Sequence, residues 1–364
     1  MATLTPQQQD ELRSDLGAMS DQIHLGLSPS RVRGAASTWR MWTKFCADMG
    51  HDPGLSDFQD PAPVLHLFGH RVRDGRHAPM GKPVSARHAE DATRQVAQAF
   101  SMVGAPDPRL NPVTGKMDAR LTRVFHGWKR SSGPAKRRKP TPRAVLDASS
   151  RHAERFPTRQ YQLLRDLMWL GFFFLLRPGE YLRTTNGKTP LTLGDVLFKC
   201  DGREYVATDI PYHALGRVSS AGIRFQMQKN GVSGDVLLHG TTGDTIACPK
   251  NVLVRIVRHL REHGATADTP LYTFWDDSGI KRNAADRNLA AFLRLGAASL
   301  NLDCETTAGS LRATGASALL AANTPIPLIK LMGRWRSDEV FRYLHLQTES
   351  LTASYASNML QAAP

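Results

Sequence analysis

Five residues in the second half of the chain have types that suit chemistry on a phosphate ester. They are Arg177, Glu180, Lys229, Arg312 and Tyr343. Guanidinium groups can bind phosphate oxygens, an ammonium group can protonate a leaving oxygen, and a phenol can act as a nucleophile. Taken one at a time, each also fits an ordinary role, such as a surface Arg–Glu pair or a tyrosine in amphipathic packing. Only their order along the chain can therefore distinguish a catalytic role from these ordinary ones.

The order of these residues resembles the catalytic domain of tyrosine recombinases. The pattern is R-x-x-E, then a hairpin lysine, an L-R helix start, and G-x-W followed by tyrosine. The closest resemblance is to the Crypton-like and DIRS-like recombinases of eukaryotic mobile elements. It covers about residues 143 to 357, and the helical part before it is similar to the family's core-binding domain in placement and length only. The matching segments are QKNGVSG at 228–234, SLRATGA at 310–316 and GRWRSDEVFRYL at 333–344.

The resemblance implies a role for each residue. Tyr343 would attack phosphorus and hold the 3′ end as a phosphotyrosine, which stores the bond energy for rejoining without ATP. Arg177 and Arg312 would clamp the phosphate, and Lys229 at a hairpin tip would protonate the leaving 5′-oxygen. Glu180 would hold Arg177 or a neighbouring group in place. The resemblance implies no metal and no cofactor.

The sequence departs from the family pattern at two positions. Gly309 stands where a histidine usually precedes the second arginine by three residues, and His345 is a candidate substitute. Nine residues before the tyrosine, where the family has histidine or tryptophan, stands Arg334, followed by Trp335. Either Trp335 packs at that place or Arg334 adds a phosphate donor. The first departure leaves room for a slower or inactive enzyme.

Composition favours a nucleic-acid partner. The 364 residues carry 47 Lys and Arg against 33 Asp and Glu, a net charge of +14, and such a surface attracts polyanions. A basic surface that only aids solubility is the alternative. The longest apolar stretch, 167–176, is too short to span a membrane, and the polar N-terminus does not resemble a secretory signal. Four well-separated cysteines, without a CxxC pair, fit a reducing compartment. These observations predict a protein that is not secreted. The resemblance, together with the basic run at 136–139, implies a nuclear location if the source is eukaryotic and a cytoplasmic one otherwise.

Periodicity predicts a mainly α fold with a small β-sheet, an α+β class, in two domains. Residues 1–130 read as a helical DNA-binding domain, with helices near 30–49, 62–75, 85–104 and 118–130. Residues 131–142, SSGPAKRRKPTP, read as a basic linker. Residues 143–364 form the predicted catalytic domain. It has a helix over 159–176, a β-rich stretch around 204–240 with a tight turn at Asn230-Gly231, and helices from 251 onward. Its tail would pack into a neighbouring protomer, or fray.

Double-stranded DNA is the predicted partner, held between the two domains by a protein that dimerises on one site and forms a tetramer in synapsis. The basic run of the linker is also compatible with nuclear import or with a plain solvated linker. A helix that opens at Lys281 and runs to about Leu300 is a candidate groove reader, or simply a basic surface. The candidate phosphate contacts are Arg31, Arg33, Arg40, Lys44, Lys136, Arg137, Arg138, Lys139, Lys281, Arg282 and Arg287.

Three other functions compete with recombination. A type IB-like topoisomerase would use the same chemistry to relax supercoils. A DNA-binding protein descended from a recombinase would keep the fold without full activity. Residues 259–263, HLREH, match the inverted zinc-protease pattern H-x-x-E-H, but they close an amphipathic helix, where histidine and arginine also suit the helix dipole.

Overall fold

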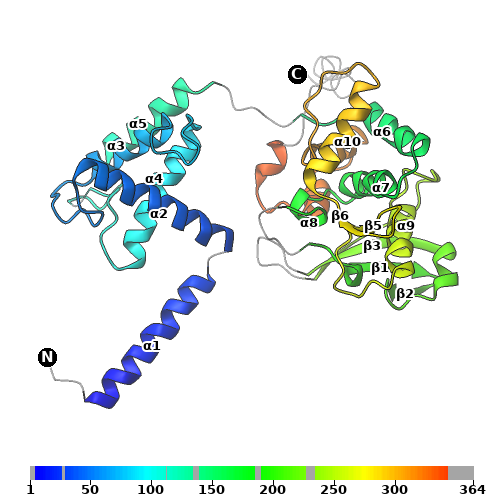
Figure 1. The fold of residues 1–364 in the computed structure, drawn as a ribbon, viewed down its shortest axis with the longest axis horizontal. Helices are drawn as coiled ribbons and strands as arrows, with labels where there is room; N and C mark the ends of the chain where they lie inside the picture. Colours follow the sequence, from blue (N-terminus) through cyan, green and yellow to red (C-terminus); the bar gives the residue numbers. More distant parts are fainter. Residues whose placement is uncertain are drawn as a thin grey trace, which may run out of the picture. The chain divides into compact units, whose positions relative to one another are not determined.

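A computed structural model of the protein describes residues 5–26, 29–111, 113–133, 139–184, 190–226 and 234–342. The chain divides into two compact units, Met1–Lys136 and Arg137–Pro364. The predicted linker, 131–142, spans this division. Figure 1 shows the helices and strands of each unit.

Unit 1 is helical and builds its core from amphipathic helices. The predicted helix that ends before Gly50 is confirmed, because α2 ends at Met49 and Gly50 takes a φ of 71°. Its Trp42 and Phe45 are fully buried. Ser85 caps the third predicted helix by accepting a hydrogen bond from the His88 amide at 3.3 Å. The helices are α1 (Pro6–Leu25), α2 (Pro29–Met49), α3 (Ala62–Arg73), α4 (Ala86–Met102) and α5 (Ala119–Ser131).

Unit 2 combines helices with two small antiparallel sheets. Helix α9 packs against both α7 and strand β3, so it joins the helical layer to the larger sheet. Leu167, Phe198 and Leu253 lie at the centre of the shared core and are fully buried. The helices are α6 (Arg143–Arg155), α7 (Arg159–Phe173), α8 (Pro178–Tyr181), α9 (Pro249–Glu262), α10 (Asp286–Ala298), α11 (Ser310–Ala321) and α12 (Ile326–Gly333), with 3-10 turns η1 (Leu193–Asp195), η2 (Tyr212–Arg217) and η3 (Asp338–Arg342).

The larger sheet carries the hairpin on which the catalytic lysine was predicted. Its strand order is β2-β1-β3-β4, and β3 and β4 pair with Phe225 opposite Asp235. The hairpin tip, 227–233, lies outside the described residues, and the predicted turn at Asn230-Gly231 lies with it. The strands are β1 (Val196–Cys200), β2 (Arg203–Val206), β3 (Val218–Phe225) and β4 (Asp235–His239), with β5 (Thr273–Trp275) and β6 (Lys281–Asn283) forming the second sheet.

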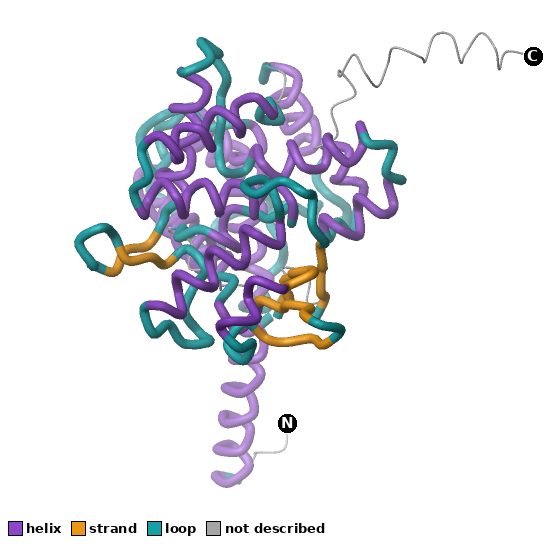
Figure 2. The backbone as a smooth tube through the Cα atoms, turned by 90° about the vertical axis from the view of Figure 1, so that its right-hand side faces the viewer, coloured by secondary structure: helices purple, strands orange, loops and turns teal. Residues whose placement is uncertain are grey.

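The predicted fold class, mainly α with a small β-sheet, is confirmed (Figure 2). The prediction that Lys281 and Arg282 open a helix is wrong. Both belong to β6, where Lys281 pairs with Trp275 and its ammonium lies 5.5 Å from the Trp275 ring centre. The helix begins only at Asp286. In the described part of the chain, no helix is long and apolar enough to cross a membrane.

Candidate active site

A left-handed turn after α7 organises the candidate site. Leu175 takes a φ of 48°, which is uncommon for a non-glycine residue and is typical of functional sites. The three successive carbonyls of 173–175 accept hydrogen bonds from three side chains that are distant in sequence. His239 Nε2 lies 3.0 Å from the first, Arg334 Nη1 3.3 Å from the second, and Arg312 Nη1 2.5 Å from the third. This short stretch therefore joins β4, α11 and the end of α12.

Arg177 and Glu180 meet at the start of α8, as predicted from their spacing. The Glu180 carboxylate accepts from the Arg177 amide at 2.8 Å through Oε2 and from Arg177 Nη1 at 2.9 Å through Oε1. Pro178 occupies the first helical position, where no amide donor is needed. The Arg177 side chain keeps 27% of its surface exposed. Of the candidate arginines at this site, it is the one that an incoming phosphate reaches most directly.

Arg334 holds the same carboxylate from the other side. Its Nη2 lies 2.9 Å from Glu180 Oε2, and its guanidinium carbon lies 3.7 Å from the centre of the Phe225 ring at the end of β3. It ends α12 in the left-handed conformation, with a φ of 56°, and its side chain is only 4% exposed. Of the two predicted alternatives, a phosphate donor at the surface does not fit this geometry. Arg334 instead positions Glu180, and through it Arg177.

The charges around Glu180 favour its ionised form. Burial raises the pKa of Glu180, but the charges of Arg334 and Arg177 and the hydrogen bonds from Arg177 outweigh burial, so the pKa lies below its usual range. One carboxylate thus serves two guanidinium groups. The cluster keeps one positive charge in excess, which suits an anionic substrate.

Arg312 lies beneath the surface of the site. It is 2% exposed, and its Nη1 and Nη2 each donate to a carbonyl at 2.5 Å, those of Leu175 and Gly333. The Trp335 ring lies against the guanidinium, 4.1 Å from centre to carbon. Trp335 therefore packs at this place, as one predicted alternative had it. Arg312 supplies buried positive charge, and direct contact with a phosphate requires its guanidinium to move outward.

Two glycines of the predicted motifs allow these close approaches. A Cβ on Gly315 would clash with the Phe172 carbonyl and would lie 2.5 Å from Cδ2 of Leu175, so glycine lets α11 reach the turn. A Cβ on Gly333 would overlap the Trp335 ring. Both glycines serve to bring Arg312 against its carbonyl partners and its aromatic cover.

The position at which the family usually has a histidine is occupied by Gly309. Gly309 is the cap residue before α11, with a φ of −72° that other residues also adopt. Sequence reasoning missed His239, which contacts the 173–175 turn from β4. Burial lowers the pKa of His239 and outweighs its hydrogen bond to the Phe173 carbonyl, so the ring is neutral at pH 7. The pairing of β3 with β4, which the turn at Asn230-Gly231 predicted, carries it here, but the sequence has no signal for its contact with the distant Phe173 carbonyl.

Several predicted residues lie outside the described part of the chain. Lys229 falls within the undescribed hairpin tip, between β3 and β4. Tyr343 follows directly on η3, which ends at Arg342. The other predicted residues in this position are His345, Lys136, Arg137 and Arg138.

The predicted DNA contacts among the described residues are exposed side chains. On α2, Arg33, Arg40 and Lys44 lie on the face opposite the buried Trp42. On unit 2, Arg282 forms an ion pair with Asp276 at 3.0 Å, whereas Lys281 lies over an indole ring. The exposed residues are Arg31, Arg33, Arg40, Lys44, Lys139, Lys281, Arg282 and Arg287.

The H-x-x-E-H segment does not form a metal site. His259 Nε2 accepts a hydrogen bond from the Trp275 amide at 3.1 Å, and the Nδ1 of His263 bonds to the His259 carbonyl at 2.9 Å. Both imidazoles thus serve the end of α9 and its contact with β5. Across the described ranges, no group of three or more potential metal ligands occurs.

Comparison with known proteins gives matches at the level of structure alone. No protein-family model and no curated protein matches this chain. The chain is similar to XerA recombinase (11% identity, TM-score 0.37, covering 94% of this chain and 95% of that one). It is also similar to the Tn1549 transposon integrase in complex with transposon right end DNA (12%, 0.46, 83% and 85%) and to the integrase from mycobacterium phage Brujita (13%, 0.29, 91% and 87%). At such identities, the chemistry has to be argued from this chain's own residues.

Proposed function

We propose that this protein cuts and rejoins DNA through a phosphotyrosine on Tyr343, as a tyrosine recombinase. The observation that carries the proposal is the convergence of three motifs on one turn. Residues 177–180, 310–316 and 333–335 are far apart in sequence, yet their arginines meet at the carbonyls of 173–175 or at Glu180. A structural role alone would not require two guanidinium groups around one carboxylate and a third, that of Arg312, buried against carbonyls beside them, because each uncompensated charge costs free energy to bury.

The proposed reaction assigns one step to each group. The Tyr343 hydroxyl gives its proton to water as its oxygen attacks phosphorus, the bond from phosphorus to the 5′-oxygen breaks, and Lys229 gives that oxygen a proton. Arg177 binds a non-bridging phosphate oxygen, while Arg312 moves up to bind the other as charge develops. Rejoining reverses these steps with a 5′-hydroxyl as the nucleophile. Glu180 and Arg334 fix Arg177, and the basic face of α2 contacts phosphates elsewhere on the duplex.

The biological setting belongs to the same proposal. The motifs QKNGVSG and GRWRSDEVFRYL favour excision or integration of a mobile element of the Crypton-like or DIRS-like kind. Such a reaction would use a dimer on each site and a tetramer in synapsis. A nuclear location would follow if the source is eukaryotic.

A nicked suicide substrate tests the proposal. When the short fragment beyond the cut diffuses away, rejoining fails and a covalent protein–DNA complex accumulates. We expect such a complex from the wild type and none from Tyr343→Phe. If the wild type forms no complex but still binds the duplex, the protein is a DNA-binding descendant of a recombinase, an alternative that Gly309 favours. Relaxation of supercoils without strand exchange between two labelled duplexes would instead indicate a topoisomerase.

A further inference from the structure

A second basic site lies away from the candidate active site, in a groove between α7 and α9. The groove has a volume of about 250 Å³. Its charged lining comes from the N-terminal half of α7 and the C-terminal half of α9. The charged residues are Arg159, Arg165, Asp166, Arg255, Arg258 and Glu262.

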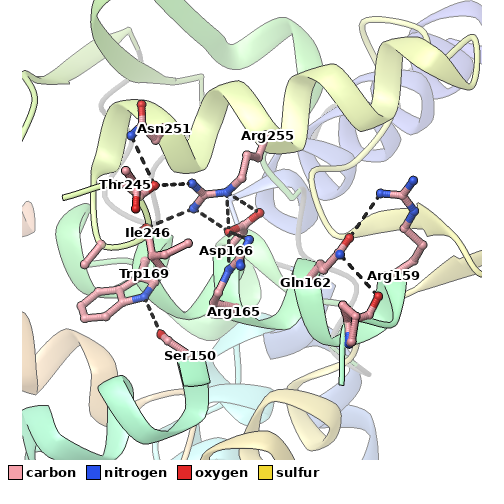
Figure 3. A network of polar contacts seen from close by, with 12 residues as sticks. Ser150, Arg159, Gln162, Arg165, Asp166, Trp169, Thr245, Ile246, Asn251 and Arg255 are labelled. Atoms are coloured by element: carbon pink, nitrogen blue, oxygen red, sulfur yellow. Dashed lines mark hydrogen bonds and ion pairs between the residues drawn. The ribbon is translucent and has the colours of Figure 1, made fainter. Parts of the chain in front are cut away.

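One carboxylate at the floor of the groove is shared by two arginines (Figure 3). Asp166 Oδ1 accepts from Arg255 Nη2 at 2.7 Å and from Arg255 Nε at 2.9 Å. It also accepts from Arg165 Nε at 3.2 Å. Arg255 additionally donates to the carbonyls of Thr245 and Ile246, at 2.8 and 3.0 Å. Asp166 is thus already satisfied by Arg255, and Arg165 brings a second charge to it.

The groove therefore holds more positive than negative charge. The side chain of Arg165 is only 9% exposed and that of Asp166 only 6%. The carboxylate of Glu262 accepts a hydrogen bond from the Tyr212 hydroxyl at 2.5 Å. His259 lines the groove too, but its Nε2 accepts from a backbone amide, which keeps the ring neutral. Among the described residues, four arginines face two carboxylates.

We propose that this groove binds a phosphate group. Guanidinium groups donate several hydrogen bonds in one plane and match phosphate oxygens better than any other side chain does. Arg165 lies deep in the groove and Arg159 and Arg258 lie at its exposed rim, so their guanidinium groups are the donors available to an anion bound there. The phosphate belongs either to the backbone of a duplex or to a free phosphate compound. The proposal does not depend on cleavage by Tyr343.

An empty groove of this kind should lower the stability of the fold. Because four arginines face two carboxylates, the groove keeps positive charge in excess, and holding that charge at a nearly buried guanidinium costs free energy that an apolar side chain of similar length does not. Arg165→Met should therefore leave the protein as stable as the wild type, or more stable, when no anion is present. The same variant should lose the stabilisation that an anion gives.

Thermal unfolding with and without pyrophosphate tests the site. At pyrophosphate about 100-fold above its Kd, the wild-type Tm should rise by about 5 °C or more, compared with chloride at equal ionic strength. Arg165→Met should show no such rise, and Arg258→Gln, at the exposed rim, only part of it. Arg203→Gln, an exposed arginine on β2, is the matched control and should behave as the wild type. The proposal is wrong if the wild-type Tm does not rise, or if Arg165→Met gains as much.

The salt dependence of duplex binding separates the two sources of phosphate. Each neutralised DNA phosphate adds about 0.9 to the slope of log K against log salt. If the groove holds a backbone phosphate, the double variant Arg159→Gln/Arg258→Gln should lower the slope by about 1, while Arg203→Gln should not. An unchanged slope, together with the pyrophosphate effect, assigns the groove to a free phosphate compound. Neither measurement requires DNA cutting, so failure of the proposed recombinase activity would leave both results intact.

Discussion

Glu180 and Asp166 are each shared by two guanidinium groups, yet the regions around them differ. Around Glu180, the backbone includes two left-handed residues, Leu175 and Arg334, and the carbonyls of Phe174 and Leu175 hold Arg334 and Arg312. The predicted nucleophile follows Arg334 by nine residues in sequence. Around Asp166, regular helices hold the arginines, and the groove lining includes no tyrosine, serine or cysteine. A shared carboxylate thus leaves one positive charge to attract a phosphate in both places. Only the region around Glu180 adds strained backbone, at Leu175 and Arg334, and a predicted nucleophile.

The largest effect should come from Arg177, the exposed guanidinium at Glu180. Arg177→Ala should slow formation of the covalent complex by about 10³-fold, because a donor to the developing charge is lost. Arg203→Gln serves as the control and should keep the wild-type rate. If Arg177→Ala formed the complex within a few-fold of the wild-type rate, Arg177 would not be a catalytic donor, and the region around Glu180 would not differ in function from the groove around Asp166.

Arg334 should act on the rate without acting on DNA affinity. In Arg334→Met, Glu180 loses its second partner and Arg177 its fixed position, which should cost about 10² in cleavage rate. Duplex affinity should stay within about two-fold, because the side chain is 4% exposed. Arg334→Lys should restore part of the rate through its charge. A variant that lost affinity and kept its rate would return Arg334 to the role of a phosphate donor.

Gly315 tests whether the close approach of α11 to the turn matters. Gly315→Ala should destabilise unit 2 by about 1–3 kcal/mol, because the added methyl meets the Phe172 carbonyl. Gly127→Ala in α5 is the control, since no atom lies within 4 Å of its added Cβ, and it should stabilise by up to about 1 kcal/mol. Urea unfolding measures both. Equal stabilisation by the two changes would contradict the packing described for Arg312.

The smallest effect is a dependence on pH. The pKa of Glu180 is lowered, so its contribution to stability is present above the ordinary carboxyl pKa of about 4.3 and is lost as pH falls through the lower folded value. Without Arg334, the charge that lowers the pKa of Glu180 most is lost, so this pKa should rise. The stability difference between the wild type and Arg334→Met should therefore be largest near pH 7 and shrink toward pH 4. If the stability difference between the two proteins did not change with pH, the ion pair of Glu180 with Arg334 would not be its source.

Sequence alone predicted the elements with clear periodicity and turn chemistry. The amphipathic α2, the cap at Ser85, the R-x-x-E start of α8 and the β3–β4 hairpin all followed from spacing. Helix α6 and strand β1 were missed. Strand β1 shows no alternation of apolar and polar residues, because four of its five residues are buried. Lys281 was wrongly placed in a helix, although it pairs with Trp275 in a local hairpin whose turn, at Asp276–Gly279, was overlooked in the sequence.

For the candidate site, spacing predicted the contact between Arg177 and Glu180 but not how differently the arginines are buried. Arg177 and Arg312 were predicted to be equivalent clamps, yet one is partly exposed and the other is buried under Trp335. That difference arises from the left-handed turn at Leu175, which no local signal marks. His239 and the Asp166 groove depend on contacts between distant elements, which spacing along the chain does not reveal.

The most direct test of the central claim is to locate the covalent bond. The trapped complex from a suicide substrate should be digested with nuclease and trypsin, and the adduct should be located by fragmentation mass spectrometry. We predict a nucleotide on Tyr343 and none on Tyr355, the other tyrosine after Arg342. An adduct on any other residue, or wild-type protein that binds the duplex and yields no adduct, would contradict the account.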